Sequence, residues 1–229
     1  MSEETKKKLA VCYSGGLDST VMLFQAVKQF GKENVIAVYT YFGQRNAETE
    51  QESFKHFTEK LGVETRKLDL SEIFSDVSKE EVTGDKSTPN GTRKMYNRNM
   101  TIIASVTAKA MSLGCNSLWL GAHYSDAAGG FVDCTEAFYN AAKQCVAVAY
   151  PWFEVGMPLI EKSKKEVIEW GIEAGMTKDD FATTWSCYRK WNREYYEVDG
   201  IKYKKPCTEC ETCHDRYDHG LKFVYPDIL

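Results

Sequence analysis

The sequence has no apolar run long enough to cross a membrane and no excess of basic residues. A membrane-spanning helix needs about 20 consecutive apolar residues, whereas the first apolar run, residues 9–13, is soon followed by Gly15 and Gly16. An apolar run this short, so soon interrupted by glycine, does not suit a signal peptide either. A formal net charge of -4 argues against a protein that binds nucleic acid without sequence preference. We therefore expect a cytoplasmic protein with no membrane partner.

Internal repeats and low-complexity segments are also absent from the sequence. Its 229 residues, 43% of them hydrophobic, suffice for one substantial α/β core. Beyond Gly175 the composition changes to Trp, Tyr, Lys and Cys, which indicates an appendage. We expect an α/β domain over residues 1–175 and a C-terminal segment over residues 176–229 that packs on it.

Apolar strand patterns and amphipathic helix patterns alternate over the first half of the chain. The expected strands are 9–13, 35–42, 64–68 and 117–120, and the expected helices are 21–30, 47–61 and 99–113. Such alternation predicts a parallel sheet with helices on both faces, and it places ligands in the loops that follow the strands. We interpret the polar residues 71–94 as a long loop over that end of the sheet.

A glycine-rich turn connects the first expected strand to the first expected helix. Two adjacent glycines let an anion approach the backbone, and Asp18, Ser19 and Thr20 place cap-type residues at a helix N-terminus, where N–H groups are unpaired. The alternative is a simple turn with an ordinary helix cap. The string S-G-G-x-D-S-[ST] lacks the Gly-Lys-[Ser/Thr] ending of the Walker loop. It resembles the PP-loop of the ATP pyrophosphatases, which cleave ATP between the α and β phosphates.

The eight cysteines fall into two groups. Four are scattered: Cys12, Cys115, Cys134 and Cys145. Of these, Cys12 lies in an expected strand and Cys145 on the apolar side of an expected helix, so we expect both thiols to be buried.

The other four cysteines have the spacing of a metal site. Cys207, Cys210 and Cys213 are spaced by three, and Cys187 supplies a fourth thiolate. Four soft ligands suit one tetrahedral Zn²⁺ per chain with no open position, which indicates a structural role. An iron–sulfur cluster, free thiols or a disulfide pair are the alternatives. His214 and His219 lie close by, but four cysteines already fill the shell.

The PP-loop together with this cysteine set resembles the 7-cyano-7-deazaguanine synthase family, often called QueC. Further matches run along nearly the whole chain, at residues 41–45, 98–99, 158–166, 185–188 and 207–216. The resemblance implies a PP-loop α/β fold, a homodimer, and an ATP-dependent C–N ligase. Such an enzyme adenylates the carboxylate of 7-carboxy-7-deazaguanine and uses ammonia to form the amide and then the nitrile.

The same resemblance implies roles for individual residues. The implied catalytic residues are Asp18, Ser19, Lys164 and Arg98, with Asp18 as the carboxylate for Mg²⁺. The implied ATP-binding residues are Tyr13, Ser14, Gly15, Gly16, Leu17, Asp18, Ser19, Thr20, Tyr41 and Gly43. The implied substrate-binding residues are Gln44, Arg45, Asn99, Asp126, Asp133 and Arg216. Simpler roles compete: Lys164 and Arg98 also suit helix starts, Asp126 and Asp133 suit turn caps, and Tyr41 suits the end of a core strand.

The chain departs from the family pattern in the expected substrate half. Residues 95–97 replace the Val-Pro before Arg98, Phe131 and Val132 replace the Tyr-Pro before Asp133, and Thr135 replaces an arginine. The sequence therefore leaves open which acceptor the activated substrate reacts with. One alternative joins the deazaguanine to an amine of a protein or stops at the amide, and a second is a PP-loop enzyme that modifies tRNA.

Between Cys187 and Cys207 the family's short loop is replaced by a longer one. Asp199 and Gly200 suit a two-residue hairpin turn between strands at 195–198 and 201–203. Lysines, arginines and aromatic residues gather over residues 189–205. We expect either a docking surface for a protein acceptor or partner, or aromatic packing around the metal site with solvated lysines.

Overall fold

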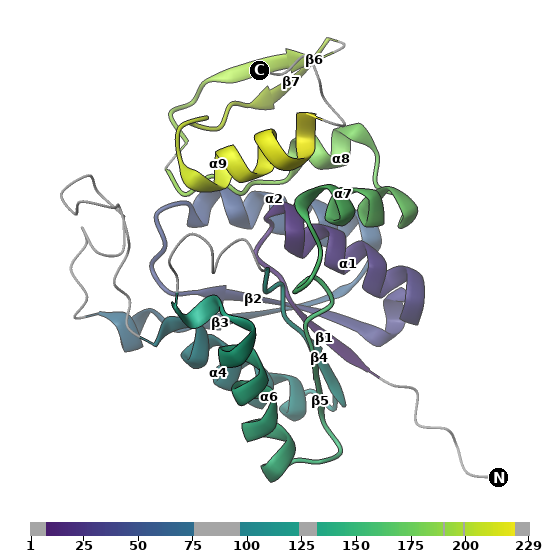
Figure 1. The fold of residues 1–229 in the computed structure, drawn as a ribbon. Helices are drawn as coiled ribbons and strands as arrows, with labels where there is room; N and C mark the ends of the chain where they lie inside the picture. Colours follow the sequence, from purple (N-terminus) through teal and green to yellow (C-terminus); the bar gives the residue numbers. More distant parts are fainter. Residues whose placement is uncertain (1–7, 76–96, 124–131, 190, 199, 223–229) are drawn as a thin grey trace.

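The structure is a computed structural model, and it describes residues 8–75, 97–123, 132–189, 191–198 and 200–222. Its centre is a five-stranded parallel sheet with the strand order β3-β2-β1-β4-β5 (Figure 1). The strands are β1 (Leu9–Cys12), β2 (Val35–Tyr41), β3 (Glu64–Asp69), β4 (Ser117–Trp119) and β5 (Glu154–Gly156). The predicted parallel sheet is confirmed. The sequence patterns missed β5, because three residues with one apolar side chain carry no periodicity.

Helices cover both faces of the sheet, as predicted (Figure 1). One face carries α1 (Leu17–Phe30), α2 (Ala47–Leu61) and α7 (Lys164–Glu173), and the other carries α4 (Arg98–Ser112) and α6 (Glu136–Ala149). Short 3-10 turns lie at η1 (Lys32–Asn34), η2 (Ser71–Phe74) and η3 (Val132–Cys134). Successive residues of a strand point to opposite faces, so Leu9 and Val11 pack with the first helix layer whereas Ala10 packs with the second.

The C-terminal segment forms a third layer above α1 and α7 (Figure 1). It contains α8 (Lys178–Thr183), the antiparallel pair β6 (Tyr195–Val198) and β7 (Ile201–Lys204), α9 (Glu211–Arg216) and the π-helical turn η4 (Tyr217–Leu221). Trp185, Tyr217 and Leu221 share one buried cluster with Leu17 and Val21. The segment therefore continues the core of the α/β layers, and the division at residue 175 stays a prediction. The predicted hairpin strands are present, although Asp199 lies outside the described residues.

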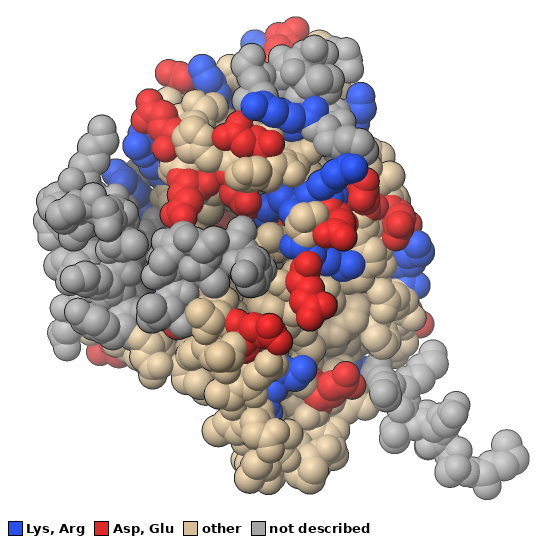
Figure 2. Space-filling model, viewed as in Figure 1, with Lys and Arg blue, Asp and Glu red and all other residues tan. Residues whose placement is uncertain are grey.

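Helix α6 presents few charged side chains to solvent, since Glu136 and Lys143 are its only charged residues. Within this fully described helix Tyr139 and Ala142 are the buried residues, whereas Val148 is 74% exposed. The prediction of a buried Cys145 is wrong: its thiol is exposed, because the helix turns Tyr139, Ala142 and Val146 toward the core instead. Figure 2 shows the end of the molecule where α6 terminates almost without charged side chains. No helix in the described ranges is both long and apolar enough to cross a membrane.

Candidate functional site

A cavity of about 300 Å³ lies at the carboxyl ends of the central strands. Loops after β1, β2 and β4 line it, together with the first residues of α4 and α7 and the C-terminal segment. This is the position that the parallel topology predicts for a ligand. The lining combines polar groups with an apolar wall formed by Ile102, Ile103, Leu120, Ala122 and Tyr139.

The PP-loop segment forms a compact turn at the start of α1. Three backbone N–H groups donate to serine hydroxyls: Ser14 to Ser19 Oγ at 3.3 Å, Gly16 to Ser14 Oγ at 3.4 Å and Leu17 to Ser186 Oγ at 3.2 Å. These long hydrogen bonds gather donors and hydroxyls at the edge of the cavity. Ser186 comes from the C-terminal segment, 169 residues away in the sequence.

Gly15 allows helix α2 to pack closely against the PP-loop segment, besides leaving the backbone of the loop open to an anion. Its φ of +85° lies in the left-handed region, and a Cβ there would stand 2.5 Å from the backbone oxygen of Glu50. The hydroxyl of Ser53 donates to the Gly15 carbonyl at 2.7 Å. Helix α2 therefore packs directly on the loop, so any side chain at this position would displace the helix.

Three residues of the predicted ATP set face the core instead of the cavity. Tyr13, Leu17 and Thr20 are at most 1% exposed. The Tyr13 hydroxyl lies 3.1 Å from Thr20 Oγ1, and its ring stacks on Phe54 at 5.2 Å between centroids. These side chains hold the strand, the loop and the helix together, while Ser14, Gly16, Asp18 and Ser19 line the cavity.

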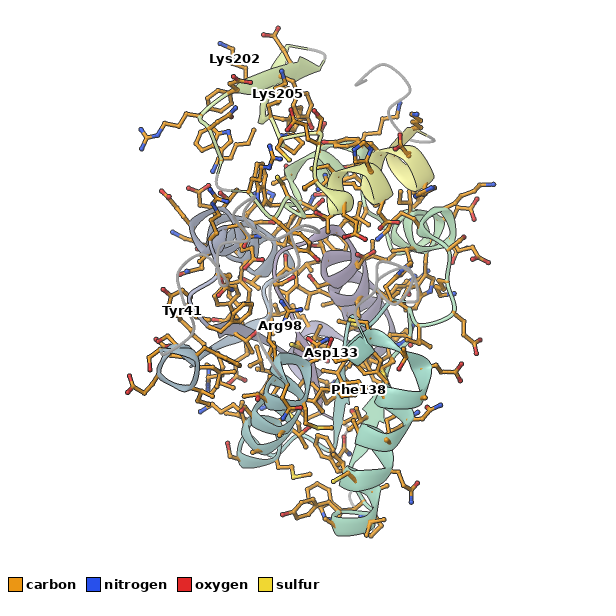
Figure 3. The ribbon with its side chains drawn as sticks, turned by 60° about the vertical axis from the view of Figure 1, so that its left-hand side comes forward. Tyr41, Arg98, Asp133, Phe138, Lys202 and Lys205 are labelled. Atoms are coloured by element: carbon orange, nitrogen blue, oxygen red, sulfur yellow. The ribbon has the colours of Figure 1, made fainter. Side chains whose placement is uncertain are left out.

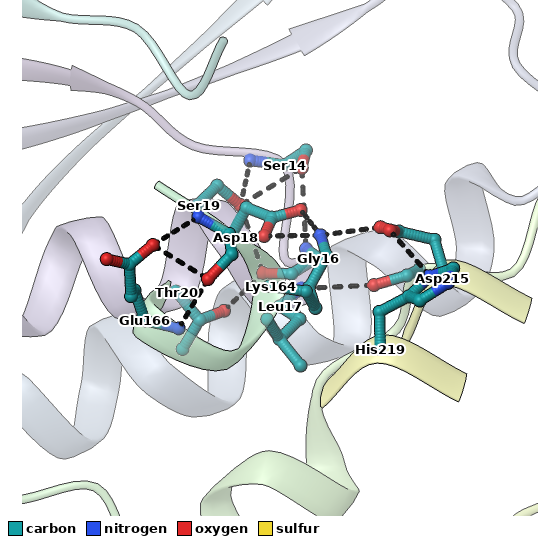
Figure 4. A network of polar contacts seen from close by, with 12 residues as sticks. Ser14, Gly16, Leu17, Asp18, Ser19, Thr20, Lys164, Glu166, Asp215 and His219 are labelled. Atoms are coloured by element: carbon teal, nitrogen blue, oxygen red, sulfur yellow. Dashed lines mark hydrogen bonds and ion pairs between the residues drawn. The ribbon is translucent and has the colours of Figure 1, made fainter. Parts of the chain in front are cut away.

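An ammonium group between two carboxylates is the most strongly charged feature of the site (Figure 4). Lys164 Nζ donates to Asp18 Oδ1 at 2.7 Å and to Oδ2 at 2.9 Å, and it lies 2.8 Å from Asp215 Oδ2. Lys164 is only 6% exposed. A capping box formed by Ser163 and Glu166 fixes the start of α7, which carries Lys164 into the cavity. The three charged groups come from α1, α7 and α9.

Burial and charge oppose each other within this group. Burial disfavours the charged Asp18 carboxylate, but the ammonium of Lys164 outweighs it, so the pKa of Asp18 lies below its ordinary value. Burial likewise disfavours charged Lys164, yet Asp18 and Asp215 hold the pKa of the lysine above its ordinary value. Burial and Lys164 lower the pKa of the nearby His123. Asp18 and Lys164 are thus charged at neutral pH.

Two other lining residues carry buried N–H groups that have no partner among the described residues. Arg216 is 5% exposed and donates from its two terminal nitrogens to the Thr184 and Phe181 carbonyls at 2.7 and 2.6 Å. The Nε atom of Arg216 and the Nε1 atom of Trp185 are buried and have no hydrogen-bond partner among the described residues. Both residues line the cavity. Because buried donors are normally paired, these two indicate a ligand with acceptor atoms.

Arg98, predicted as catalytic, and Asn99, predicted to bind substrate, begin α4, and Figure 3 shows Arg98 beside Asp133. The Arg98 guanidinium lies 5.8 Å from the centre of the Phe42 ring, and both residues line the cavity. Asn99 Nδ2 donates to the Asp133 carbonyl at 3.0 Å and to Cys134 Sγ at 3.3 Å. Asn99 therefore holds α4 to the turn before α6.

Other predicted residues lie outside the cavity lining or outside the described residues. Within the described ranges, the lining does not include Tyr41, Gly43, Arg45 or Asp133. Tyr41 is covered by Lys67, whose ammonium lies 5.0 Å from the ring centre. Asp126 is not among the described residues, so its predicted role stays a prediction.

Gln44 does line the cavity, as part of a buried hydrogen-bond network. Its amide nitrogen donates to Glu50 Oε2 at 2.9 Å and to the Tyr39 hydroxyl at 3.0 Å. Asn46 Nδ2 donates to Glu50 Oε1 at 3.0 Å and also to the Cys187 carbonyl at 3.1 Å. The network fixes the loop after β2 and joins it to the C-terminal segment.

The four predicted metal ligands lie together. The sulfur atoms of Cys187, Cys207, Cys210 and Cys213 are all within 4.8 Å of one another. The nearest contacts are 3.4 Å for Cys210 to Cys213 and 3.9 Å both for Cys187 to Cys210 and for Cys207 to Cys213. Four thiolates at about 2.3 Å from one ion stand about 3.8 Å apart. This donor set therefore fits a single tetrahedral ion.

The neighbouring histidines have other partners. His214 Nδ1 lies 3.1 Å from Asp218 Oδ2, and His219 Nδ1 lies 3.6 Å from Asp215 Oδ1. Within the part of the chain that the structure describes, the cluster of possible metal ligands consists of the four cysteines alone.

Sequence reasoning missed four residues that connect the cavity to the metal cluster: Asn46, Glu50, Ser186 and Asp215. Ser186 and Asp215 could have been noticed, because each lies within two residues of a cysteine in the metal motif. Asn46 and Glu50 gave no such signal, since a polar first turn is ordinary for a helix.

Comparison with known proteins agrees with this geometry. The sequence model of the family of the queuosine biosynthesis protein QueC matches residues 8–223 of this chain. The chain is 31% identical over 195 residues to the 7-cyano-7-deazaguanine synthase of Koribacter versatilis, covering 80% of this chain and 81% of the relative. It is 30% identical over 221 residues to that of Marinomonas sp., covering 93% of this chain and 92% of the relative.

Among solved structures, the chain resembles the U34-tRNA thiolase NcsA from Methanococcus maripaludis with its [4Fe-4S] cluster. The TM-score is 0.50 at 20% identity, and the match covers 76% of this chain and 60% of the thiolase. At that identity the likeness shows the fold alone, whereas the sequence matches extend over nearly the whole chain. This chain belongs to the family of the queuosine biosynthesis protein QueC.

Proposed function

We propose that the chain is an ATP-dependent ligase that acts as a 7-cyano-7-deazaguanine synthase. The observation that carries the proposal is the Lys164 ammonium, held between Asp18 and Asp215 at the edge of a cavity that the PP-loop also lines. A site that activates a carboxylate with ATP must bind two anions, so it needs fixed cations and N–H donors. Lys164, Arg98 and Arg216 line one cavity and meet that need.

In the proposed reaction, an oxygen of the substrate carboxylate attacks the α-phosphorus of ATP, and the bond to pyrophosphate breaks. Ammonia then attacks the acyl adenylate, loses a proton and displaces AMP, which leaves an amide. The amide oxygen then attacks the α-phosphorus of a second ATP and releases pyrophosphate, and loss of AMP and two protons gives the nitrile. Mg²⁺ bound with ATP neutralises the leaving pyrophosphate, and Asp18 is the carboxylate that we expect to hold it.

The residues of the loop have distinct tasks in this proposal. Phosphate oxygens are stronger acceptors than serine hydroxyls, so they replace the long bonds that the loop N–H groups make to Ser14, Ser19 and Ser186. The buried donors Arg216 Nε and Trp185 Nε1 supply further hydrogen bonds to the anion. The apolar wall offers a surface for a flat deazapurine ring, beside Gln44 and Asn99.

The metal is proposed to be Zn²⁺ with a structural role. In a four-iron cluster each thiolate binds a different iron, which sets the thiolates further apart than around a single ion. The close sulfur contacts support one ion. With four cysteines in a tetrahedral shell, no position is left for water or substrate.

The direct test is the product mixture from ATP, Mg²⁺, 7-carboxy-7-deazaguanine and ammonia. We expect AMP and pyrophosphate in equal amounts, and by mass spectrometry a product with the mass of the nitrile. The amide as sole end product would favour the truncated reaction, and a product that forms only with a protein amine would favour the other acceptor. ADP and phosphate without AMP would contradict adenylation altogether.

The hairpin over residues 189–205 is proposed to pack the metal-binding segment, because the structure pairs most of its described cations. Arg189 lies 2.6 Å from Glu209, Lys205 lies 3.6 Å from Glu194, and Lys204 contacts Glu52. The Lys204 ammonium also lies 4.5 Å from the Trp191 ring centre. These contacts support the packing interpretation over a docking surface for a partner protein.

A homodimer is also proposed, with the end of α6 as the contact. Val148, Tyr150 and Trp152 are 74%, 47% and 60% exposed, in a region almost without charge (Figure 2). Large exposed apolar side chains that gather in one place are typical of an interface. We expect Trp152→Glu to convert the dimer to a monomer in light scattering, whereas Ile172→Glu, at a residue 46% exposed on α7, leaves it a dimer. A monomeric wild-type protein would contradict the proposal.

A further inference from the structure

The cysteine cluster and the cavity are joined by contacts on both sides of the metal ligands. Before the first ligand, the backbone N–H of Trp185 donates to the Gly15 carbonyl at 3.0 Å, and Ser186 Oγ accepts from the backbone N–H of Leu17. The carbonyl of the ligand Cys187 itself accepts from Asn46. Three consecutive residues therefore bind the PP-loop and the loop after β2.

On the other side, one short helix carries both metal ligands and cavity residues. Helix α9 has Cys210 at its N-cap and Cys213 in its first turn, and Asp215 and Arg216 form its end. Asp215 lies 2.8 Å from the Lys164 ammonium, and Arg216 binds the carbonyls at the end of α8. A helix of six residues is not stable by itself. Its position therefore depends on contacts outside the helix: the cysteine cluster holds its first turn, and Tyr217 and Leu221 after its last turn are buried in the core.

The structure places Asp215, two residues after the cysteine Cys213, against the charged centre of the site. With Asp215 present, the buried Lys164 is shared between two carboxylates from different elements. Without the metal, α9 would lose the anchor of its first turn, which would loosen the hold on Asp215 and Arg216 in the cavity. A site that binds an anionic nucleotide would then lose the cation of Arg216 and the carboxylate of Asp215, which is a partner of Lys164.

We propose that Asp215 is a positioning residue that couples the Cys₄ metal centre to nucleotide binding. The metal sets the position of α9, and α9 sets the positions of Lys164 and Arg216. This proposal rests on the proposed function in one respect, that ATP binds at the PP-loop. Coupling between two sites is reciprocal. Bound nucleotide therefore slows metal loss, by the same factor as the metal raises nucleotide affinity if rebinding is unaffected.

The test measures the rate at which metal-loaded protein releases zinc to a chromogenic chelator, with and without saturating α,β-methylene ATP and a fixed excess of Mg²⁺. Calorimetry on the loaded protein measures the affinity for the same analogue. For the wild type we expect the analogue to slow release by at least about fivefold, the lower end of typical coupling. In Asp215→Asn we expect the slowing to disappear while one zinc per chain remains bound.

Asp218→Asn is the matched control. Asp218 lies on the same stretch of chain, but it pairs with His214 and Lys222 and is not part of the cavity lining among the described residues. We expect this variant to keep the wild-type slowing. If α,β-methylene ATP binds the wild type but leaves the release rate unchanged, or if Asp215→Asn retains the slowing, the coupling is wrong while the proposed function stands. If loaded wild-type protein does not bind the analogue at all, the proposed function fails and the coupling with it.

Discussion

Replacing Asp18 with asparagine is expected to reduce release of AMP and pyrophosphate by at least about 100-fold, the effect of losing one preorganised electrostatic group at a reacting phosphate or carbonyl. The substitution removes the carboxylate that pairs with buried Lys164 at 2.7 Å and that we expect to hold Mg²⁺. An amide of the same size cannot neutralise either cation. A pyrophosphate-release assay with saturating ATP measures the effect.

The fold is expected to survive this substitution. Lys164 keeps Asp215 at 2.8 Å, so its buried charge retains a partner, and Asp18 has a partly exposed side chain. The unfolding temperature and the zinc content of Asp18→Asn should therefore stay close to those of the wild type. Asp69→Asn makes the same change of charge at a carboxylate that accepts from Ser71 outside the cavity, and it should retain activity. Wild-type pyrophosphate release by Asp18→Asn would remove Asp18 from the mechanism.

The architecture was largely predictable because its strands are buried. β2 has six consecutive buried residues, from Val35 to Thr40, and such a run is typical of the centre of a parallel sheet. The antiparallel hairpin was predictable from its turn and from the aromatic residues on either side. β5 was not, since Glu154–Gly156 has one buried apolar side chain and joins the sheet through pairing with β4.

The position of the cavity was predictable from the sequence, but the side chains that line it were not. A glycine-rich string predicts where a phosphate binds, yet neighbouring residues at the start of a helix point in different directions. Leu17 and Thr20 consequently face the core, while Asp18 and Ser19 between them line the cavity. No local pattern could show that distinction before the packing of α2 and α7 was known.

Long-range pairings were the least predictable part of the site. The family resemblance implied that Lys164 is catalytic, but its charge is stabilised by Asp18, 146 residues away. Asp215 completes the pairing from α9, the helix that also carries Cys210 and Cys213. Periodicity and spacing describe segments, whereas this group exists only when three segments pack together.

Replacing Cys210 with serine is expected to abolish stoichiometric zinc binding and to destabilise the protein. Cys210 is in the middle of the cluster, with Cys213 Sγ at 3.4 Å and Cys187 Sγ at 3.9 Å, so its loss opens the tetrahedral shell. Metal-binding free energy is folding free energy when the unfolded chain has no formed site. A loss of about 4 kcal/mol would lower the unfolding temperature by roughly 10 °C in a chain of this size.

Two measurements decide this last prediction: zinc per chain by elemental analysis, and thermal unfolding followed by circular dichroism. Cys145→Ser is the matched control, because that thiol is exposed on α6, away from the cluster, and its loss should change neither value. A Cys210→Ser protein with one zinc per chain and wild-type unfolding would show that the four cysteines do not share an ion. Iron and inorganic sulfide in the wild type would instead assign the site to a cluster. Loss of zinc with an unchanged unfolding temperature would show that the metal does not stabilise the fold. The packing of Cys213, Tyr217 and Leu221 would then be enough to hold α9 in place.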